Sequence, residues 1–553
     1  ALPMPRAFQG SFSPDGRRFA YRMPSSWDEE RRNYRGGQNK AIWILDMDDH
    51  DLEEIKPWDR TKEMDPVWIG QHVYFLSDRD GASNVWGYDT RTKQLKQATH
   101  FKDLDAKSLG TDGKALVIEQ AGYLWTLDPA GTAQPTRLAI HVRGDFPWMM
   151  ARWEEIAPRL TNAQLSATGK RAVFEARGDI FTVPTERGAD WRNLTNSPGT
   201  AERAPSWSPD GQWISYFSDA SGEYKLVIVA QDGAGQKREI AIPDAKYYYT
   251  PSWSPDSKKI LFTDTDLRVW LVDVGTSKAT HLDTDAWMVP QRSVDPVWSP
   301  DSRWITYAKR LDNLLHAIFV YNTETNQKHQ ITDGFSDATS PAFDASGKYL
   351  YFLAGTNFGL NTGWLDMTSY DRPSTRGVYF AVLKKGEPSP LLPPKGDEAA
   401  SASPRPDSAS PARGGGAGGG AAGAEGQGER AARSTPARTV RVDIDFDGIE
   451  QRILALPVPE RDYRSLQAGA ENQVFYIEPA QGGGGGGRGG AGGGGASLQR
   501  YNLREREGRE FLSGVQSYTL SADRKKVLYR SGANWSVVNS DGAPPQATAG
   551  RID

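Results

Sequence analysis

The chain has 553 residues, a formal net charge of −4 and 38% hydrophobic residues, which is enough apolar material for folded cores and excludes a wholly disordered chain. The slightly acidic balance offers no basic surface to nucleic acid, and the absence of cysteine excludes disulfides, thiolate nucleophiles and Cys-based zinc sites. No apolar run approaches the roughly 18 residues of a membrane helix. We therefore expect no nucleic-acid partner and no membrane span.

Residues 1–140 predict three small β-sheets, centred on Phe12, Val67 and Leu116. Their strands are short, alternate with period two and are rich in aromatic and β-branched residues, as in SNVWGYDT from Ser83. Three such units cannot close a ring, since propellers typically need four to eight blades. We interpret residues 1–140 as the later blades of a propeller whose earlier blades are missing, and the chain as a piece of a longer protein.

A connector and a longer second array follow. Residues 141–160, HVRGDFPWMMARWEEIAPRL, break the pattern and predict an inter-domain segment. From residue 161 to 553 an aromatic residue followed by Ser-Pro-Asp recurs, at Trp207, Trp253 and Trp298, with spacings of 46 and 45 residues. Degenerate copies of the phrase begin at Leu165, Phe343 and Leu520. The period matches the roughly 40–50 residues of one propeller blade.

Each copy of the phrase predicts one blade. Proline fixes φ and Asp-Gly favours a tight turn, so Ser-Pro-Asp-Gly joins two strands as a hairpin. A third, apolar-aromatic strand follows, such as LRVWLVDV from Leu267, and then a polar fourth strand, such as HQITDG from His329. We count seven blades in residues 161–553, the sixth built from VRVDIDFDGIEQRILALPV and NQVFYIEP. The predicted fold class is all-β, a β-propeller architecture with four-stranded blades.

Two low-complexity segments interrupt the second array. They cover about residues 396–437 and 481–496 and consist mainly of Gly, Ala, Ser and Pro. Such segments cannot bury enough apolar surface to become ordered. We interpret both as disordered insertions in turns between strands. An RNA-binding Gly/Arg segment is the functional alternative, which the scarcity of Arg and the absence of aromatic residues disfavour.

The sequence contains no constellation that carries chemistry. There is no His-Glu-x-x-His, no Gly-x-Ser-x-Gly and no P-loop. The histidines, which include no pair with metal-ligand spacing, are interpreted as surface or satisfied core residues; they occupy positions 50, 72, 100, 141, 281, 316 and 329. We predict no catalytic residue, no cofactor and no metal site in this chain.

Some polar and aromatic residues have a functional as well as a structural interpretation. Calcium ligation is the functional interpretation of the turn aspartates, but we favour bonds within each turn because the ligand series of a calcium loop is missing; these residues are Asp15, Asp210, Asp256 and Asp301. A second group is interpreted as solvated loop carboxylates, namely Asp264, Asp266, Asp283 and Asp285. The YYYT cluster at Tyr247 lines a channel or packs between blades, and we favour packing. The segment WDEERRNYRGGQ from Trp27 is interpreted as a solvated loop, with an interface or a carboxylate-binding patch as the alternative.

The longer phrases resemble one protein family. ALPMPRAFQGSFSPDGRRFAY from Ala1, YRGGQNKAIWILDMDD from Tyr34 and VYFLSDRDG from Val73 are similar to the later blades of the first, six-bladed propeller of tricorn-type serine peptidases. The stretch that begins VFEARGDIFTVP at Val173 resembles the start of their second, seven-bladed propeller, and SDATSPAFDASG at Ser336 resembles its middle. The resemblance covers nearly the whole chain apart from the glycine-rich insertions. The short blade phrase by itself is shared with TolB-like propellers.

The resemblance implies that residues 1–140 are the last three blades of a six-bladed propeller and that residues 161–553 form a seven-bladed propeller. It further implies that the chain gates or channels peptides to a catalytic domain outside it, within a self-associating, cytoplasmic serine peptidase. No position matches the family's catalytic residues, so this segment is expected to be non-catalytic. The alternatives are a stand-alone TolB-like scaffold that binds proteins and the propeller half of a prolyl-oligopeptidase-type or amidohydrolase fusion. A periplasmic or exported location is the alternative compartment.

Overall fold

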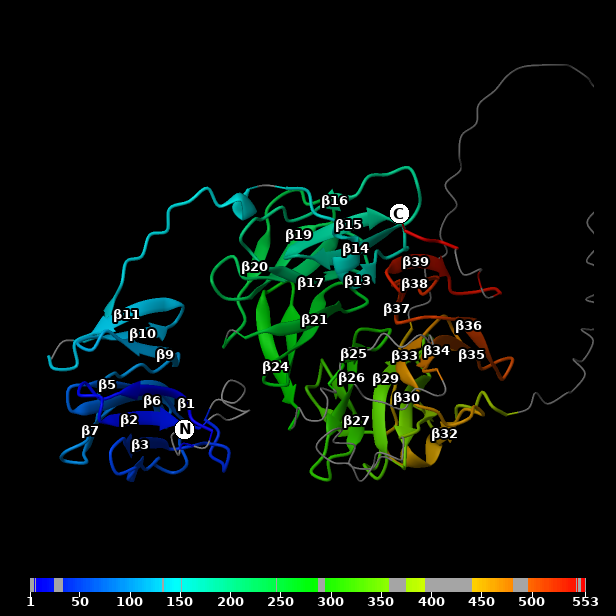
Figure 1. Ribbon diagram of the computed structural model, residues 1–553. Coiled ribbons are helices and arrows are strands. Elements are labelled where there is room, and N and C mark those ends of the chain that lie inside the picture. Colours follow the sequence, from blue (N-terminus) through cyan, green and yellow to red (C-terminus); the bar gives the residue numbers. More distant parts are fainter. Residues whose placement is uncertain are drawn as a thin grey trace, which may run out of the picture. The chain divides into compact units, whose positions relative to one another are not determined.

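The computed structural model describes residues 4, 6–23, 33–131, 134–150, 152–244, 246–286, 294–357, 374–392, 440–480, 496–543, 545 and 549–552. Backbone contacts divide the chain into two compact units, Ala1–Arg152 and Trp153–Asp553. Each sheet is an antiparallel meander of strands that follow one another in the chain (Figure 1). The predicted all-β fold class is confirmed. No helix in the described part of the chain is long and apolar enough to cross a membrane.

The first unit contains three four-stranded sheets. Their strands are β1 (Phe8–Phe12), β2 (Arg18–Arg22), β3 (Ile42–Asp46) and β4 (Leu52–Ile55); β5 (Glu63–Ile69), β6 (His72–Asp80), β7 (Ala82–Asp89) and β8 (Leu95–Gln97); and β9 (Ala106–Thr111), β10 (Leu116–Gln120), β11 (Tyr123–Leu127) and β12 (Thr136–Arg137). The first strands of successive sheets contact each other, β1 with β5 and β5 with β9. Buried apolar clusters lie between neighbouring sheets, one around Trp68 and Phe75 and one around Leu76 and Leu116.

The second unit contains seven sheets, six of four strands and one of three among the described residues. The first four are β13 (Thr161–Leu165), β14 (Arg171–Ala176), β15 (Asp179–Pro184) and β16 (Arg192–Asn193); β17 (Glu202–Trp207), β18 (Trp213–Ser218), β19 (Lys225–Ala230) and β20 (Arg238–Ile240); β21 (Tyr248–Trp253), β22 (Lys259–Asp264), β23 (Arg268–Asp273) and β24 (Lys278–Thr284); and β25 (Val297–Trp298), β26 (Trp304–Arg310), β27 (His316–Asn322) and β28 (Lys328–Gln330).

The remaining three sheets are β29 (Asp337–Phe343), β30 (Tyr349–Gly355), β31 (Gly377–Val382) and β32 (Ile453–Ala455); β33 (Arg464–Ala468), β34 (Gln473–Glu478), β35 (Ser497–Asn502) and β36 (Glu507–Leu512); and β37 (Ser517–Leu520), β38 (Lys526–Ser531) and β39 (Asn534–Asn539). The described residues also contain the short 3₁₀ helices η1 (Pro147–Met149), η2 (Ala157–Arg159) and η4 (Glu450–Arg452). The first two lie in the predicted connector, and the contact division falls between Arg152 and Trp153. The domain boundaries at residues 140 and 160 stay a prediction.

The seven sheets of the second unit form a closed ring. Figure 1 shows them following one another around a centre until β37 lies beside β13, and these two strands are in contact. A buried cluster joins the first and last sheets across this closure, with Phe174 packed edge-on against Trp535 at 5.4 Å between ring centroids. The ring is closed by apolar packing, since all four strands of the first sheet are consecutive in the chain. The predicted seven-bladed propeller is confirmed.

The recurring Ser-Pro-Asp phrase forms the turn between the first and second strands. At Ser208, Ser254 and Ser299 the hydroxyl donates to the aspartate two residues later, at 2.5–2.6 Å. The phrase also links neighbouring sheets. The amide of Asp256 donates to Ser302 Oγ of the next turn at 3.0 Å, and the indole of Trp253 donates to the Ser206 carbonyl at 3.2 Å. The repeat therefore specifies contacts between blades as well as the hairpin within each blade.

One predicted blade was assembled from the wrong segments. The stretch VRVDIDFDGIEQRILALPV contains β32, which pairs with β31 and completes the fifth sheet; the sixth sheet starts later, with β33. The insertion at 396–437 separates β31 from β32 in the chain. Because the two strands are not neighbours in the sequence, their pairing was not predicted. That insertion and residues 481–495 of the second one lie outside the described residues.

Candidate functional site

The start face of the second unit gathers its polar and aromatic side chains. We give this name to the side on which the first strand of each sheet begins. Turns between second and third strands lie on the same side, because neighbouring strands run in opposite directions. The first strands of neighbouring sheets contact each other, including β13 with β17 and β17 with β21, so they line the centre of the ring. Residues near their starts therefore lie around the centre of the ring on this face.

A bulge near the start of the first strand recurs in both units. The pairing of the first strand with the second shifts in several sheets, and in six of them a residue at the shift has a left-handed φ of 41–53°; these residues are Gln9, Asp65, Asn162, Ala204, Ser340 and Ser465. Only glycine adopts this conformation at no steric cost. The amide of one bulge residue, Ala204, donates to Glu175 of the preceding sheet at 2.7 Å. The bulges carry no glycine signal, so sequence reasoning missed them.

Aromatic residues dominate the start face at the second and third sheets. Tyr248 is buried between Phe217 and Phe262, so the predicted packing of the YYYT cluster between blades is correct for this residue. Tyr247 instead is 40% exposed and makes edge contacts with Tyr224 and Tyr249. The tyrosine cluster therefore has one side in the core and the other on the start face.

An ionic chain crosses the fourth, fifth and sixth sheets on the same face. Asp337 accepts from His316 Nδ1 at 2.5 Å and from Arg376 at 3.1 Å, and Arg376 also contacts Asp462 at 3.3 Å. Burial opposes the charge of Asp337, but the hydrogen bond and charge of His316, together with Arg376, hold the pKa of this carboxyl below its usual value. His316 Nε2 is buried and has no hydrogen-bond partner in the described residues. The Asp337–His316 pair therefore lacks the hydroxyl of a Ser-His-Asp arrangement there.

The predicted loop carboxylates are mostly buried. Asp266 is exposed, but Asp264, Asp283 and Asp285 are not, so their interpretation as solvated residues is wrong. Asp264 accepts from Arg268 and from the Trp270 indole. Burial opposes the charge of Asp283, but hydrogen bonds from Lys309, Tyr307 and Lys328 hold its pKa below the usual value. These carboxylates stabilise neighbouring strands because each is supplied with donors.

The other predicted residues are also placed by the structure. The aspartates of the Ser-Pro-Asp turns accept hydrogen bonds within their own turns, as predicted. Residues 24–32 lie outside the described residues, and Arg35 from the same segment pairs with Asp78 at 2.7 Å. Of the histidines, His316 is buried, His329 stacks on Phe446, and His50, His100, His141 and His281 are exposed. No group of three or more metal-ligating side chains occurs in the described ranges.

The first unit has its own buried ion pair at the corresponding end of β5. Glu63 Oε1 accepts from Thr61 at 2.6 Å, from Ser77 at 3.1 Å and from Arg79 at 3.1 Å. Burial raises the pKa of Glu63 to about 7, against the opposing effect of Arg79. No metal or catalytic partner accompanies this pair among the described residues. Glu63 lies near the start of a first strand, as Asp337 does. The pKa of Glu63 is raised, however, whereas that of Asp337 is lowered.

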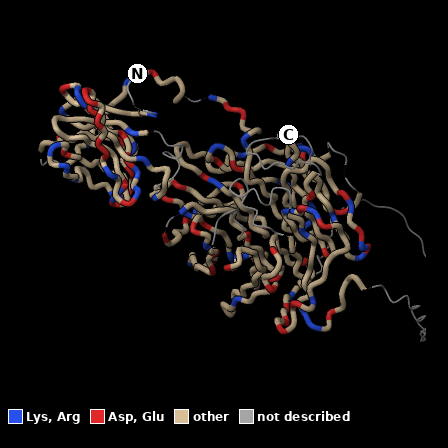
Figure 2. Tube along the Cα trace, turned by 60° about the horizontal axis from the view of Figure 1, so that its bottom comes forward, with Lys and Arg blue, Asp and Glu red and all other residues tan. Residues whose placement is uncertain are grey.

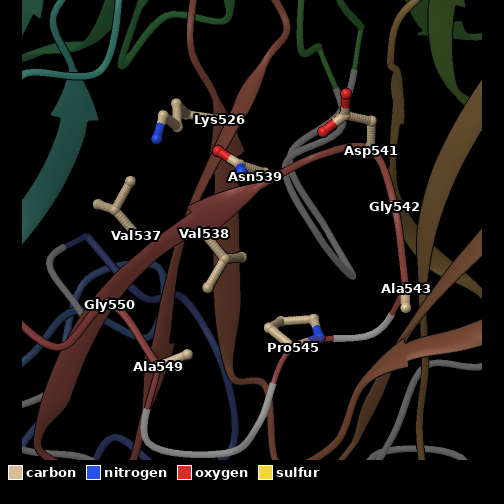
Figure 3. Close-up of a pocket in the computed structure, with 10 residues that line it drawn as sticks. All are labelled: Lys526, Val537, Val538, Asn539, Asp541, Gly542, Ala543, Pro545, Ala549 and Gly550. Atoms are coloured by element: carbon tan, nitrogen blue, oxygen red, sulfur yellow. The ribbon is translucent and has the colours of Figure 1, made fainter.

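A pocket of about 540 Å³ lies beside the last strand of the second unit. Figure 3 shows it between β39, with Val537, Val538 and Asn539, and the segment that carries Asp541, Ala543 and Pro545. The last sheet has three strands in the described chain, and residues 550–552 pair with β39 through an isolated bridge between Arg551 and Ser536. Lys526 and Asp541 are the charged lining residues. The lining offers neither a nucleophile–base pair nor a cluster of metal ligands.

The fold consists of β-propeller blades, which form a closed ring in the second unit, and the start face of this ring carries aromatic and paired ionic residues. Figure 2 shows basic and acidic residues interspersed along the tube rather than gathered in one region. Residues 160–541 match the model of the tricorn protease second beta propeller domain, and residues 1–133 match the tricorn protease N-terminal beta propeller domain. The chain belongs to the tricorn protease family.

Curated relatives agree with this assignment. Tricorn protease homolog 1 of Streptomyces coelicolor is 26% identical over 92% of this chain and 46% of its own length. Tricorn protease of Thermoplasma acidophilum is 23% identical over 90% of this chain and 42% of its own length. A crystal structure of the tricorn protease aligns with a TM-score of 0.57 and 20% identity, covering 96% of this chain and 47% of that one. The chain thus spans less than half the length of these relatives.

Proposed function

We propose that this chain is the non-catalytic propeller region of a tricorn-type serine peptidase and guides peptides to a catalytic site outside the chain. The closed ring of the second unit carries the proposal, because its start face presents both aromatic rings and charged groups around the centre of the ring. Extended peptides need contacts of both kinds along their length. The family membership and the span of less than half of the relatives support the location of the chemistry elsewhere.

The residues of the start face agree with guidance rather than hydrolysis. The Asp337–His316 pair has no hydroxyl on the free imidazole nitrogen in the described chain. Arg376 and Arg268 are held by carboxylates and so form a fixed rim. A fixed rim selects which chains enter without taking part in bond cleavage. For the parent we propose self-association and a cytoplasmic location, as the family resemblance implies.

Peptide binding without cleavage tests this function. Fluorescein-labelled peptides of ten residues are titrated against the chain and followed by anisotropy, and the same mixtures are then analysed by mass spectrometry. Saturable binding and intact peptides are expected. A peptide carrying a photoreactive phenylalanine should cross-link to the start face of the second unit. Cleavage by this chain alone, or no binding by any peptide, would contradict the proposal, whereas binding of folded proteins only would favour a scaffold.

A further inference from the structure

One half-buried arginine on the start face differs from its neighbours. Arg268 pairs with Asp264 at 2.7 Å, and Arg376 pairs with Asp337 at 3.1 Å. Arg203, at the start of β17, has no carboxylate within ion-pair distance among the described residues; its hydrogen bond runs to the carbonyl of Tyr248 at 3.2 Å. A guanidinium group carries five donors that match a carboxylate in geometry. Most of the hydrogen-bonding capacity of Arg203 is therefore unused by the described chain.

The side chain of Arg203 is nevertheless held in place. Its guanidinium carbon lies 3.7 Å from the ring centroid of Tyr247 and 6.0 Å from that of Tyr224. Tyr247 contacts the edges of Tyr224 and Tyr249, at 5.8 and 5.3 Å between centroids. We call these four residues the Arg203 patch. Stacking on a ring orders an arginine before a ligand arrives, which lowers the entropy lost on binding.

The carboxylates nearest in the fold are bound to other groups. Glu175 accepts from the amide of Ala204 at 2.7 Å and from the side chain of Asn162 at 2.5 Å. Asp219 accepts from the amide of Ala201 at 2.7 Å. Both carboxylates hold backbone amides in or next to β17. In the described chain the patch therefore combines a cation that has no ion-pair partner with exposed aromatic surface.

We propose that the Arg203 patch binds an acidic side chain of an extended peptide together with a neighbouring aromatic side chain. The carboxylate would accept two hydrogen bonds from Arg203, and the aromatic ring would pack against Tyr247 and Tyr224. Tyrosine suits such contacts because it offers a large surface at low conformational cost. This inference rests on the proposed function and names the kind of segment that the rim prefers.

A side-chain carboxylate fits this place better than the carboxyl terminus of a peptide. The patch lies where β17 and β21 begin, on the start face, and Tyr247 is exposed there rather than enclosed in a pocket. An extended chain presents a side chain to the same surface at every second residue, whereas it has one terminus. The source of the carboxylate is therefore tested directly, with peptides that have free or amidated C-termini.

The test compares four fluorescein-labelled decapeptides that differ only at the centre or at the end. Because residues two apart face the same side of an extended chain, the central triplets are Asp-Ser-Phe, Asn-Ser-Phe and Asp-Ser-Ala, called Asp-Phe, Asn-Phe and Asp-Ala after their outer residues. The Asp-Phe peptide is made with a free and with an amidated C-terminus. The wild-type chain should bind both Asp-Phe peptides equally and about tenfold more tightly than the other two. The Arg203→Gln variant should bind the Asp-Phe peptides only as tightly as the wild type binds the Asn-Phe peptide. The Tyr247→Ala variant, changed at an exposed position, should bind the Asp-Phe peptides only as tightly as the wild type binds the Asp-Ala peptide.

Arg137→Gln is the matched control, because Arg137 lies over the ring of Tyr123 at 4.6 Å in the first unit. It should leave all four affinities unchanged. The inference is overturned if Arg203→Gln and Tyr247→Ala bind every peptide as the wild type does, or if amidation alone removes the preference. Failure of the wild type to bind any peptide would instead overturn the proposed function itself. Thermal unfolding of each variant verifies that it is folded.

Discussion

The two units are built from the same kind of sheet but end differently. In the second unit the last sheet returns to the first, and Phe174 and Trp535 are buried where they meet. In the first unit β1 contacts β5 and β5 contacts β9. Phe12 of the first sheet is 55% exposed, and Tyr123 of the third is 50% exposed. Closure buries the apolar faces of the first and last sheets of the ring against each other.

This difference indicates what keeps each unit folded. A closed ring distributes the packing over every sheet, so the loss of one junction exposes two faces at once. Among the described residues of the first unit, apolar packing between sheets lies at two junctions, one around Trp68 and Phe75 and one around Leu76 and Leu116. The second unit should therefore unfold as one cooperative body, and its weakest point should be the junction that joins the two ends of its chain.

The largest expected effect comes from breaking the closure. Phe174→Ala should lower the free energy of unfolding of the second unit by about 4 kcal/mol, because it removes a buried ring and leaves a cavity against Trp535. Phe12→Ala, in the exposed end of the first unit, should cost less than about 1 kcal/mol. Calorimetry of the whole chain measures both. Equal losses of unfolding free energy in the two variants would show that the junction between the first and last sheets does not stabilise the ring.

A second substitution tests Asp337, one of two buried acids whose effects on stability should depend on pH in opposite ways; the other is Glu63. Asp337→Asn should destabilise the second unit by about 3 kcal/mol at neutral pH, since it leaves Arg376 and His316 without their shared carboxylate. The pKa of Asp337 is lowered in the folded state, so its contribution is present above the usual pKa of 3.8 and is lost as the pH falls through the lower folded value. The cost of the substitution should shrink in acid, and a cost that grows there would contradict this sign.

Glu63 of the first unit should show the opposite dependence. Its pKa is raised from 4.5 to about 7, so its contribution is full below the unfolded value and is lost as the pH rises through the folded value. Between pH 5 and 8 the wild type should lose roughly 2 kcal/mol of stability relative to Glu63→Gln. Chemical unfolding at the two pH values measures this difference. Glu54→Gln, at an exposed position of β4, is the control and should show no such change.

The smallest expected effect concerns one hydrogen bond between blades. Ser302→Ala removes the acceptor of the Asp256 amide and should cost about 1 kcal/mol in the second unit. Ser302 is buried, so the amide is left without a substitute on that side. Ser221→Ala, in an exposed turn of the same ring, should be neutral. Thermal shifts of the two variants give the comparison, and equal shifts would contradict a role for the bond between turns.

Local sequence patterns predicted much of the fold but little of the start face. The period-two strands and the Ser-Pro-Asp turns predicted the sheets, because both signals act within a few residues. The pairing of β31 with β32 was missed, because the local sequence of a strand does not identify a partner strand far away in the chain. The burial of Asp264, Asp283 and Asp285 was also missed, since loop composition alone does not show which donors surround a carboxylate.

The amino-acid sequence alone determined that this protein consists of repeated four-stranded blades, because hairpin turns and strand alternation are properties of neighbouring residues. Tertiary structure alone decided that the seventh blade packs on the first and that His316, Asp337 and Arg376 meet. It also placed Arg203 against the ring of Tyr247. These features depend on distances between segments far apart in the chain, which emerge only when the ring closes.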